Sequence, residues 1–269
     1  MLELDTVQRL IFVIGHKNNM INTVHLWDCI EIMKSIPDGS IDAIIADIPY
    51  WSTKCSWDQV LPFDLMWEQL KRIIKPNGAI VLFGSEPFSS ALRMSNIKQY
   101  KYDWIWEKER PTNIFWMKSS PWKVHEIISV FGWWAFYPLK EASLQPKNNK
   151  WNKSQTWDMN VIETLWNTKM KIWDDYDNTL RNPRSVLKIS RWTKWNKKLH
   201  PTQKPVALIE YLIKTYTNEW ETVLDFTIGS GTTAIACINT NRNYIGFELD
   251  KWYFDIANER IAWKSENKK

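Results

Sequence analysis

Glycines and carboxylates near the end of the chain are spaced as in a pocket for an adenosine-type cofactor. The segment Val223–Cys237 reads as a short apolar strand ending near Asp225, a tight turn with Gly229 and Gly231, and a helix. Doubly wound α/β proteins bind such cofactors where a strand leads through a glycine turn into a helix N-terminus. The next predicted strand, Tyr244–Glu248, ends in a carboxylate that can accept both hydroxyls of a ribose. A glycine turn alone is weak evidence, because many helices begin with one.

Two further segments could contribute chemistry to the same pocket. Ala46-Asp-Ile-Pro-Tyr50 follows a predicted buried strand, so it places a carboxylate and an aromatic ring at that strand's carboxyl end. His200-Pro-Thr-Gln-Lys-Pro205 precedes an apolar helix, and Pro205 suits the first turn of that helix. A lysine at a helix start opposes the helix dipole, so an anionic ligand nearby is a physical reason for Lys204.

These three segments, in this order, resemble the permuted, β-class amino-methyltransferases of DNA. That family carries an Asp-Pro-Pro-Tyr loop, then a His-Pro-Thr-Gln-Lys-Pro segment and then a Gly-x-Gly turn, and the resemblance covers residues 20–265. It implies S-adenosylmethionine as the cofactor and double-stranded DNA as the substrate. It also implies a doubly wound α/β fold with a mostly parallel, seven-stranded sheet and an inserted DNA-recognition region.

The resemblance assigns the reaction to Asp47-Ile-Pro-Tyr50. The lone pair of an exocyclic amine is delocalised into its ring, so a catalyst should accept hydrogen bonds from the amino protons while the nitrogen attacks the methyl group. In the family a carboxylate and the next residue's carbonyl do this, here Asp47 and Ile48. Pro49 completes the loop, and Tyr50 is expected to stack on a base rotated out of the duplex. Ile48 replaces a proline that would stiffen the loop, and Trp51 replaces a small residue.

The resemblance also supplies a set of cofactor-binding residues: Asp28, Gly84, His200, Thr202, Lys204, Asp225, Thr227, Gly229, Gly231 and Glu248. Thr202 and Lys204 are expected at the cofactor's carboxylate, and Gly84 at the floor of the pocket. Asp28 is expected at the cofactor's adenine, but it is equally suited to cap the following helix, and the two roles are compatible. Thr227 departs from the aromatic residue that many relatives show.

The first residue of the catalytic loop bears on the substrate. In the family an aspartate there goes mostly with adenine N6, and a serine with cytosine N4. We therefore favour a sequence-specific adenine-N6 methyltransferase, as found in restriction–modification or phage self-protection. Two alternatives stay open: cytosine-N4 methylation, and a DNA-binding pseudoenzyme that lost turnover through Ile48 and Trp51. Protein glutamine methyltransferases carry their Asn-Pro-Pro-Tyr loop after the cofactor turn, the reverse of the order here.

Alternating strands and helices are expected to position these residues. Apolar patterns predict strands at Thr23–Leu26, Ile41–Ala46, Ala79–Phe83, Tyr102–Trp106, Glu126–Phe131, Thr222–Phe226 and Tyr244–Glu248, and helices at Asp28–Ser35, Pro62–Lys75, Pro87–Met94, Pro205–Tyr216, Gly231–Ile238 and Lys251–Trp263. This alternation predicts a mostly parallel sheet. We expect residues 20–265 to form the catalytic domain, residues 140–199 an inserted target-recognition region, and residues 1–19 an N-terminal extension without a match in the family.

The inserted region carries the positive charge of the chain. The whole chain has 35 Lys and Arg against 30 Asp and Glu, a net charge of +5, whereas residues 140–199 hold 13 basic and 6 acidic residues, an excess of 7. Cations suit phosphates, and Asn and Arg can read base edges. A solvated basic loop explains any single residue there, so the interpretation applies to the segment as a whole.

Composition excludes several classes of protein. Cys29, Cys55 and Cys237 form no C-x-x-C pair, so we expect no metal site and no disulfide framework. The longest early apolar run, Leu10–Ile14, is far shorter than the roughly 18 residues of a membrane span. We expect a cytoplasmic protein that acts as a monomer or a homodimer. The chain has 19 Trp and only 8 Gly; a UGA codon read as tryptophan and sequence drift both explain this pattern.

Overall fold

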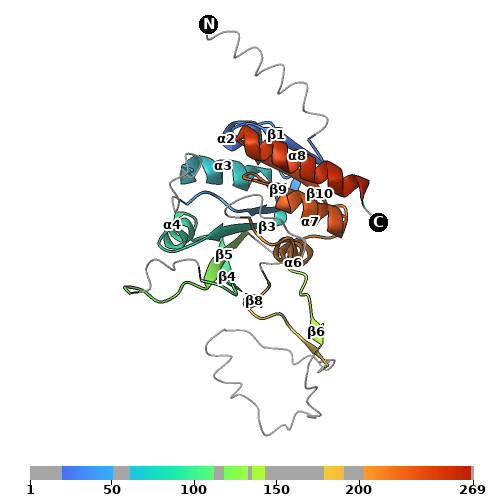
Figure 1. The fold of residues 1–269 in the computed structure, drawn as a ribbon. Helices are drawn as coiled ribbons and strands as arrows, with labels where there is room; N and C mark the ends of the chain where they lie inside the picture. The colour runs from blue at the N-terminus through green and yellow to red at the C-terminus, as the bar shows by residue number, and fades with distance from the viewer. Residues whose placement is uncertain are drawn as a thin grey trace, which may run out of the picture. The chain divides into compact units, whose positions relative to one another are not determined.

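Continuous apolar runs form the strands, and apolar residues at helical spacing form the helices. The computed structural model describes residues 20–50, 61–111, 118–132, 135–142, 179–190 and 203–267 (Figure 1). The strands are β1 (Thr23–Leu26), β2 (Ile41–Ala46), β3 (Ile74–Gly84), β4 (Tyr100–Glu107), β5 (His125–Gly132), β6 (Glu141–Ala142), β7 (Leu180–Arg181), β8 (Val186–Lys188), β9 (Thr222–Asp225) and β10 (Asn243–Glu248). The helices are α2 (Cys29–Met33), α3 (Phe63–Ile73), α4 (Phe88–Ser95), α6 (Val206–Tyr216), α7 (Thr232–Thr240) and α8 (Lys251–Glu266).

One sheet carries the fold, with its strands in the order β1-β10-β9-β2-β3-β5-β4-β8. The strands from β1 to β3 run parallel, β5 runs antiparallel to both β3 and β4, and β8 is parallel to β4. The prediction of a mostly parallel, doubly wound sheet is confirmed. The predicted count of seven strands misses β8, whose three residues are too few to give a readable pattern, although Leu187 is buried.

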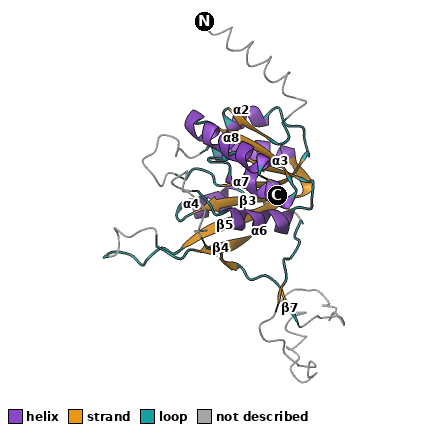
Figure 2. Cartoon of the chain, turned by 45° about the vertical axis from the view of Figure 1, so that its right-hand side comes forward, coloured by secondary structure: helices purple, strands orange, loops and turns teal. Residues whose placement is uncertain are grey.

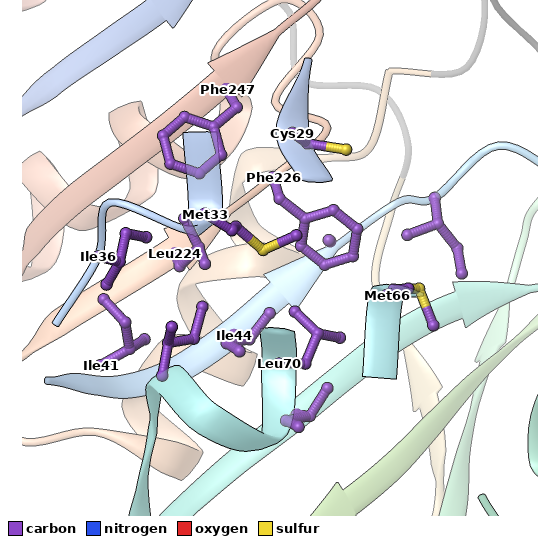
Figure 3. Packing of buried hydrophobic residues seen from close by; sticks show 14 of the residues in the cluster. Cys29, Met33, Ile36, Ile41, Ile44, Met66, Leu70, Leu224, Phe226 and Phe247 are labelled. Carbon is purple, nitrogen blue, oxygen red and sulfur yellow. The ribbon is translucent and has the colours of Figure 1, made fainter. Parts of the chain in front are cut away.

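Helices cover both faces of this sheet (Figure 2). On one face, buried residues of α2, α3 and α4 pack against alternate residues of the central strands. Figure 3 shows Met33 of α2 and Leu70 of α3 directed toward Ile44 and Leu224 of the strands beneath. On the other face, α6, α7 and α8 pack against the intervening residues, such as Ile45 and Val223. The core is therefore two apolar layers separated by the sheet.

The connections change face between β9 and β2. From β9 the chain runs through α7 to β10 and then to α8, on one face, whereas from β1 it runs through α2 to β2 and through α3 to β3, on the other. At such a switch point the loops at the carboxyl ends of the two central strands separate, and ligands of doubly wound proteins bind there. The topology thus predicts where a site should lie.

The chain divides into two compact units, Met1–Tyr137 with Ser185–Lys269, and Pro138–Arg184. The described part of the smaller unit contains an antiparallel pair, β6 with β7, in which Glu141 faces Arg181 and Ala142 faces Leu180. Most of the predicted recognition region and all of residues 1–19 lie outside the described residues. Within the described ranges, no helix is both long and apolar enough to cross a membrane.

Candidate active site

A cavity of about 460 Å³ opens at the carboxyl ends of β1, β2, β9 and β10. Its lining includes Trp27 and Asp28 after β1, Asp47 and Pro49 after β2, residues 225–230 after β9, and Glu248 at the end of β10. This is the position that the switch in connections predicts, and the volume lies in the range of small-molecule sites. Four segments that are distant in sequence therefore meet in one pocket.

The glycine turn between β9 and α7 forms one wall of the cavity. Gly229 and Gly231 have φ values of 53° and 80°, in the left-handed region that side chains with a Cβ rarely occupy. A Cβ on Gly231 would also lie 3.2 Å from Cα of Ala257. The turn is tied to β10 because the Ile228 amide donates to the Phe247 carbonyl at 3.0 Å. Both glycines are thus required by backbone geometry, and they expose the start of α7 to the cavity side.

Glu248 holds the turn from the neighbouring strand. Its Oε2 accepts the Gly229 amide at 2.8 Å, and its Oε1 accepts the amides of Leu249 and Asp250 at 3.0 and 2.9 Å. Burial raises the pKa of Glu248, although these three amide donors oppose that rise. Asp250 in turn caps α8 by accepting from the amide of Trp252. The carboxylate is therefore fixed at the cavity wall by backbone donors.

Asp225 lies at the end of β9, deeper in the same wall. Its Oδ1 accepts the Thr227 amide at 3.1 Å, and its Oδ2 accepts the Thr233 hydroxyl at 2.5 Å. Burial raises the pKa of Asp225 to about 7, with smaller contributions from the charges of Asp47 and Glu248, while the two hydrogen bonds oppose the rise. With Asp28 and Asp47, four carboxyl groups therefore line one cavity.

Asp47 is the only one of these acids that pairs with a cation in the described contacts. Its Oδ2 accepts from the ammonium group of Lys204, which also lies 3.5 Å from Oε2 of Glu126. Lys204 is buried, 6% exposed, with its Nζ 5.1 Å from the centre of the Phe83 ring. Burial acts to lower the pKa of Lys204, but Asp47 and Glu126 outweigh it and hold that pKa above its usual value.

The other residues of the predicted catalytic loop have side chains in different environments. Ile48 is 2% exposed and belongs to the core of the α2–α4 face, so its side chain anchors the loop by packing. Pro49 lines the cavity. The Tyr50 ring lies 5.6 Å from the ring of Phe88 in α4, tilted by 34°. Trp51 lies outside the described residues.

The other predicted cofactor residues differ in their relation to the cavity. Asp28 lines it and also caps α2, since its Oδ1 accepts the amides of Ile30 and Glu31 at 2.9 and 3.1 Å. Thr227 lines it with a buried hydroxyl that has no hydrogen-bond partner in the described part of the protein. Gly84 ends β3 but does not line the cavity, whereas its neighbour Phe83 does. His200 and Thr202 lie outside the described residues.

Two charged residues next to the site, Glu126 and Lys108, were not predicted from the sequence. Glu126, the second residue of β5, accepts at Oε1 from Nζ of Lys108, 3.0 Å away, and Lys108 directly follows β4. The signal was a glutamate at the start of an otherwise apolar strand, which indicates a partner when that strand is buried. No group of three or more His, Cys, Asp or Glu side chains within the described ranges could hold a metal ion.

Comparisons with known proteins agree with this arrangement. The family model described as DNA methylase matches residues 41–259. The Type II methyltransferase M.HinfI of Haemophilus influenzae is 30% identical over 274 residues, covering 91% of this chain and 69% of that protein. The Type II methyltransferase M2.DpnII of Streptococcus pneumoniae is 27% identical and covers 93% of this chain and 92% of its own length.

Solved structures show the same fold. The crystal structure of the M1.HpyAVI–SAM complex is 27% identical, covers 89% of this chain and 98% of that chain, and gives a TM-score of 0.59. The PvuII DNA methyltransferase, named as cytosine-N4-specific, has a TM-score of 0.62 over 88% of this chain and 85% of its own. At 16% identity, that second likeness concerns the fold alone.

Proposed function

This chain belongs to the DNA methylase family, whose model spans residues 41–259, and from that premise we propose that it transfers a methyl group from S-adenosylmethionine to N6 of adenine in double-stranded DNA. One observation carries the proposal. The carboxylate of Asp47 borders the same cavity as the glycine turn and Glu248. A group that can accept amino protons thus lies beside a wall suited to an adenosine-type cofactor.

The cavity residues fit S-adenosylmethionine. Glu248 offers a fixed carboxylate to ribose hydroxyls, and the Thr227 hydroxyl is a buried polar group for which a ligand would supply a partner. Gly229 and Gly231 leave the backbone accessible at close range. When bound, the cofactor supplies a methyl group on a positively charged sulfur, which is an electrophile for an amine.

Each residue of the catalytic loop would then have a separate role toward the target base. Asp47 would accept a hydrogen bond from the amino group, which localises the nitrogen lone pair for attack on the methyl group that a bound cofactor would supply. The carbonyl of Ile48 accepts the second amino proton. Packing of the Ile48 side chain replaces the stiffness that a proline would give to this carbonyl. Tyr50 stacks on the adenine after it leaves the duplex.

The relatives support a role in DNA modification. Two similar proteins are named as Type II methyltransferases, so we propose that this enzyme modifies a specific sequence in a restriction–modification setting. Residues 140–199 would contact DNA, since their excess of 7 positive charges matches the phosphate backbone. The enzyme would act in the cytoplasm, as a monomer or a homodimer.

Methyl transfer from labelled S-adenosylmethionine to DNA of mixed sequence, followed by nucleoside analysis, tests the proposal. We expect N6-methyladenine. N4-methylcytosine would instead establish the cytosine alternative, and binding of DNA and cofactor without any methylated base would establish a pseudoenzyme.

The variant Asp47→Ala tests the assignment of the catalytic group. It should abolish turnover, because Asp47 acts mainly in the transition state, while calorimetry should give a nearly unchanged cofactor affinity. A variant that still methylates at the native rate would remove Asp47 from the reaction.

A further inference from the structure

A buried row of alternating charges leads from the catalytic carboxylate to the far strands of the sheet. Asp47 pairs with Lys204, Lys204 lies 3.5 Å from Glu126, and Glu126 lies 3.0 Å from Lys108. The side chain of Lys108 is 3% exposed, and those of Glu126 and Asp47 remain mostly covered. Neither Glu126 nor Lys108 lines the cavity. The row therefore starts at the site and continues where neither cofactor nor base is expected.

Four separate segments supply the row. Asp47 follows β2, Lys204 precedes α6, Glu126 is the second residue of β5, and Lys108 follows β4. Two cations alternate with two anions, so each buried charge has an opposite neighbour, and removing one member leaves another uncompensated. Burial acts to raise the pKa of Glu126, yet Lys204 and Lys108 outweigh it and lower that pKa. The two lysines thus favour the charged form of Glu126.

We propose that Lys204 is a positioning residue for Asp47, and that Glu126 and Lys108 hold Lys204 in place. The inference rests on the proposed function, since it gives Asp47 its catalytic role. An ammonium group fixed between two carboxylates keeps the Asp47 carboxylate in one orientation and in its charged form. Lys204 also lines the cavity, so the contact with the cofactor's carboxylate that the resemblance implied stays a prediction, and positioning of Asp47 is a separate role.

The charged groups around Asp47 determine how the methylation rate should depend on pH. Lys204 faces Asp47 from the segment before α6, and Asp225 interacts with it from β9. Glu126 and Tyr50 interact with Lys204 itself. Without the ammonium group, Asp47 keeps acidic neighbours and loses its cation, so it binds a proton more readily. A protonated carboxyl group accepts hydrogen bonds poorly, and the reaction should slow as pH falls.

Single-turnover methylation at saturating cofactor, measured across pH for Lys204→Met, tests the proposal. We expect the rate to fall about 100-fold, the scale for a misplaced catalytic group, and to decrease more steeply than the native rate as pH is lowered. Cofactor affinity should change less than about threefold. Lys204→Arg, which keeps the charge, should recover part of the rate and the native pH profile.

Two more variants separate positioning from general damage. Glu126→Gln touches neither cofactor nor base, and it should lower the rate without altering cofactor affinity. Lys75→Met removes a lysine paired with Asp42 at 2.5 Å, away from the cavity, and should leave rate and pH profile native. The proposal is overturned if Lys204→Met weakens cofactor binding tenfold or more and saturating cofactor restores the rate.

A double-mutant cycle of Asp47→Asn and Lys204→Met in thermal unfolding gives a readout that needs no turnover. Coupling between the two changes supports the pair, and additive effects overturn it. If the native protein fails to methylate adenine, the proposed function fails by that assay alone, and this cycle still decides whether Lys204 acts on Asp47.

Discussion

The Asp225 carboxyl lies under the cavity wall, where it accepts from the Thr227 amide and the Thr233 hydroxyl. Burial raises its pKa from 3.8 to about 7. A carboxyl group with a raised pKa binds its proton more tightly in the folded than in the unfolded protein. Its stabilising contribution is therefore complete below about pH 4 and is lost as pH rises toward about 7.

We expect Asp225→Asn to remove this pH dependence. The amide keeps an oxygen for the Thr227 amide and cannot ionise, so the variant should gain roughly 1–4 kcal/mol over the native protein at pH 8 and little at about pH 4. Denaturant unfolding at both pH values measures the difference. Asp38→Asn, at an exposed acid paired with Arg72, is the matched control and should show no such change. An equal effect of Asp225→Asn at both pH values would contradict the argument.

Glu248 accepts the Gly229 amide of the glycine turn, and we propose that it also binds the cofactor. Glu248→Ala should weaken S-adenosylmethionine binding by roughly 1–3 kcal/mol, the scale for losing charge-assisted hydrogen bonds. It also leaves the Gly229 amide without its acceptor, so Glu248→Gln, which keeps one oxygen, should lose less. Calorimetry measures the affinity of the native protein, Glu248→Ala and Glu248→Gln for S-adenosylmethionine. An unchanged affinity in both variants would show that Glu248 does not bind the cofactor.

At the scale of single residues, the sequence could predict contacts between residues that are close together in the chain. The N-cap role of Asp28 was foreseen because it depends on Ile30 and Glu31, two and three positions away. The partner of Lys204 was not, because Asp47 and Glu126 reach it only through the order and register of the strands. Ion pairs between residues far apart in the chain follow no regular sequence spacing, so they cannot be predicted from the sequence pattern.

Strands and helices were predictable to within a few residues where their apolar patterns are long. β1 and β2 have the predicted limits, and α7 begins one residue after Gly231. The short β8 was missed, and β3 begins earlier than predicted, at Ile74, because Ile74 pairs with Ile41 before a register shift. Pairing of this kind depends on the partner strand, so a single segment's pattern does not contain it.

The turn that leads from α6 into β9 contains a strained residue. Trp220 has a φ of 69° and is 71% exposed, so its side chain gains little from packing. Its amide donates to the Asn241 carbonyl at 2.7 Å, and its carbonyl accepts from the Asn243 side chain at 2.6 Å. These bonds hold the backbone in a conformation that favours glycine. Trp220 thus joins Trp51 as a tryptophan where a small residue is expected.

Trp220→Gly should therefore stabilise the protein. Relief of the left-handed conformation outweighs the greater freedom of glycine in the unfolded chain, for a net gain of roughly 0.5–1 kcal/mol. Trp252→Gly is the matched control, since Trp252 is 70% exposed but helical in α8. That change should instead destabilise by about 1 kcal/mol. Thermal unfolding of both variants compares them, and a loss of stability in both would show that the Trp220 side chain packs usefully.

For the whole molecule, charge divides the predicted recognition region into two parts. Residues 143–178 contain five Lys and five Asp or Glu, whereas residues 179–199 contain seven Lys or Arg and no acid. Affinity for the phosphate backbone depends on net positive charge, while sequence is read through contacts to base edges. The two parts should therefore contribute differently, the first to target choice and the second to affinity.

Replacing residues 143–178 by a short Gly-Ser turn tests this division. The ends of that stretch are adjacent, because Ala142 pairs with Leu180 in the β6–β7 ladder. The shortened protein should bind S-adenosylmethionine as the native one does, since residues of the larger unit line the cavity. It should keep salt-dependent DNA binding but lose preference for one sequence.

The double change Arg181→Ala with Arg184→Ala should keep the preference for one sequence. It should lower affinity for all DNA and reduce the salt slope by up to about 2. Binding to specific and random duplexes across salt concentrations measures both effects, and a shortened protein that still selects its target would place recognition elsewhere in the chain.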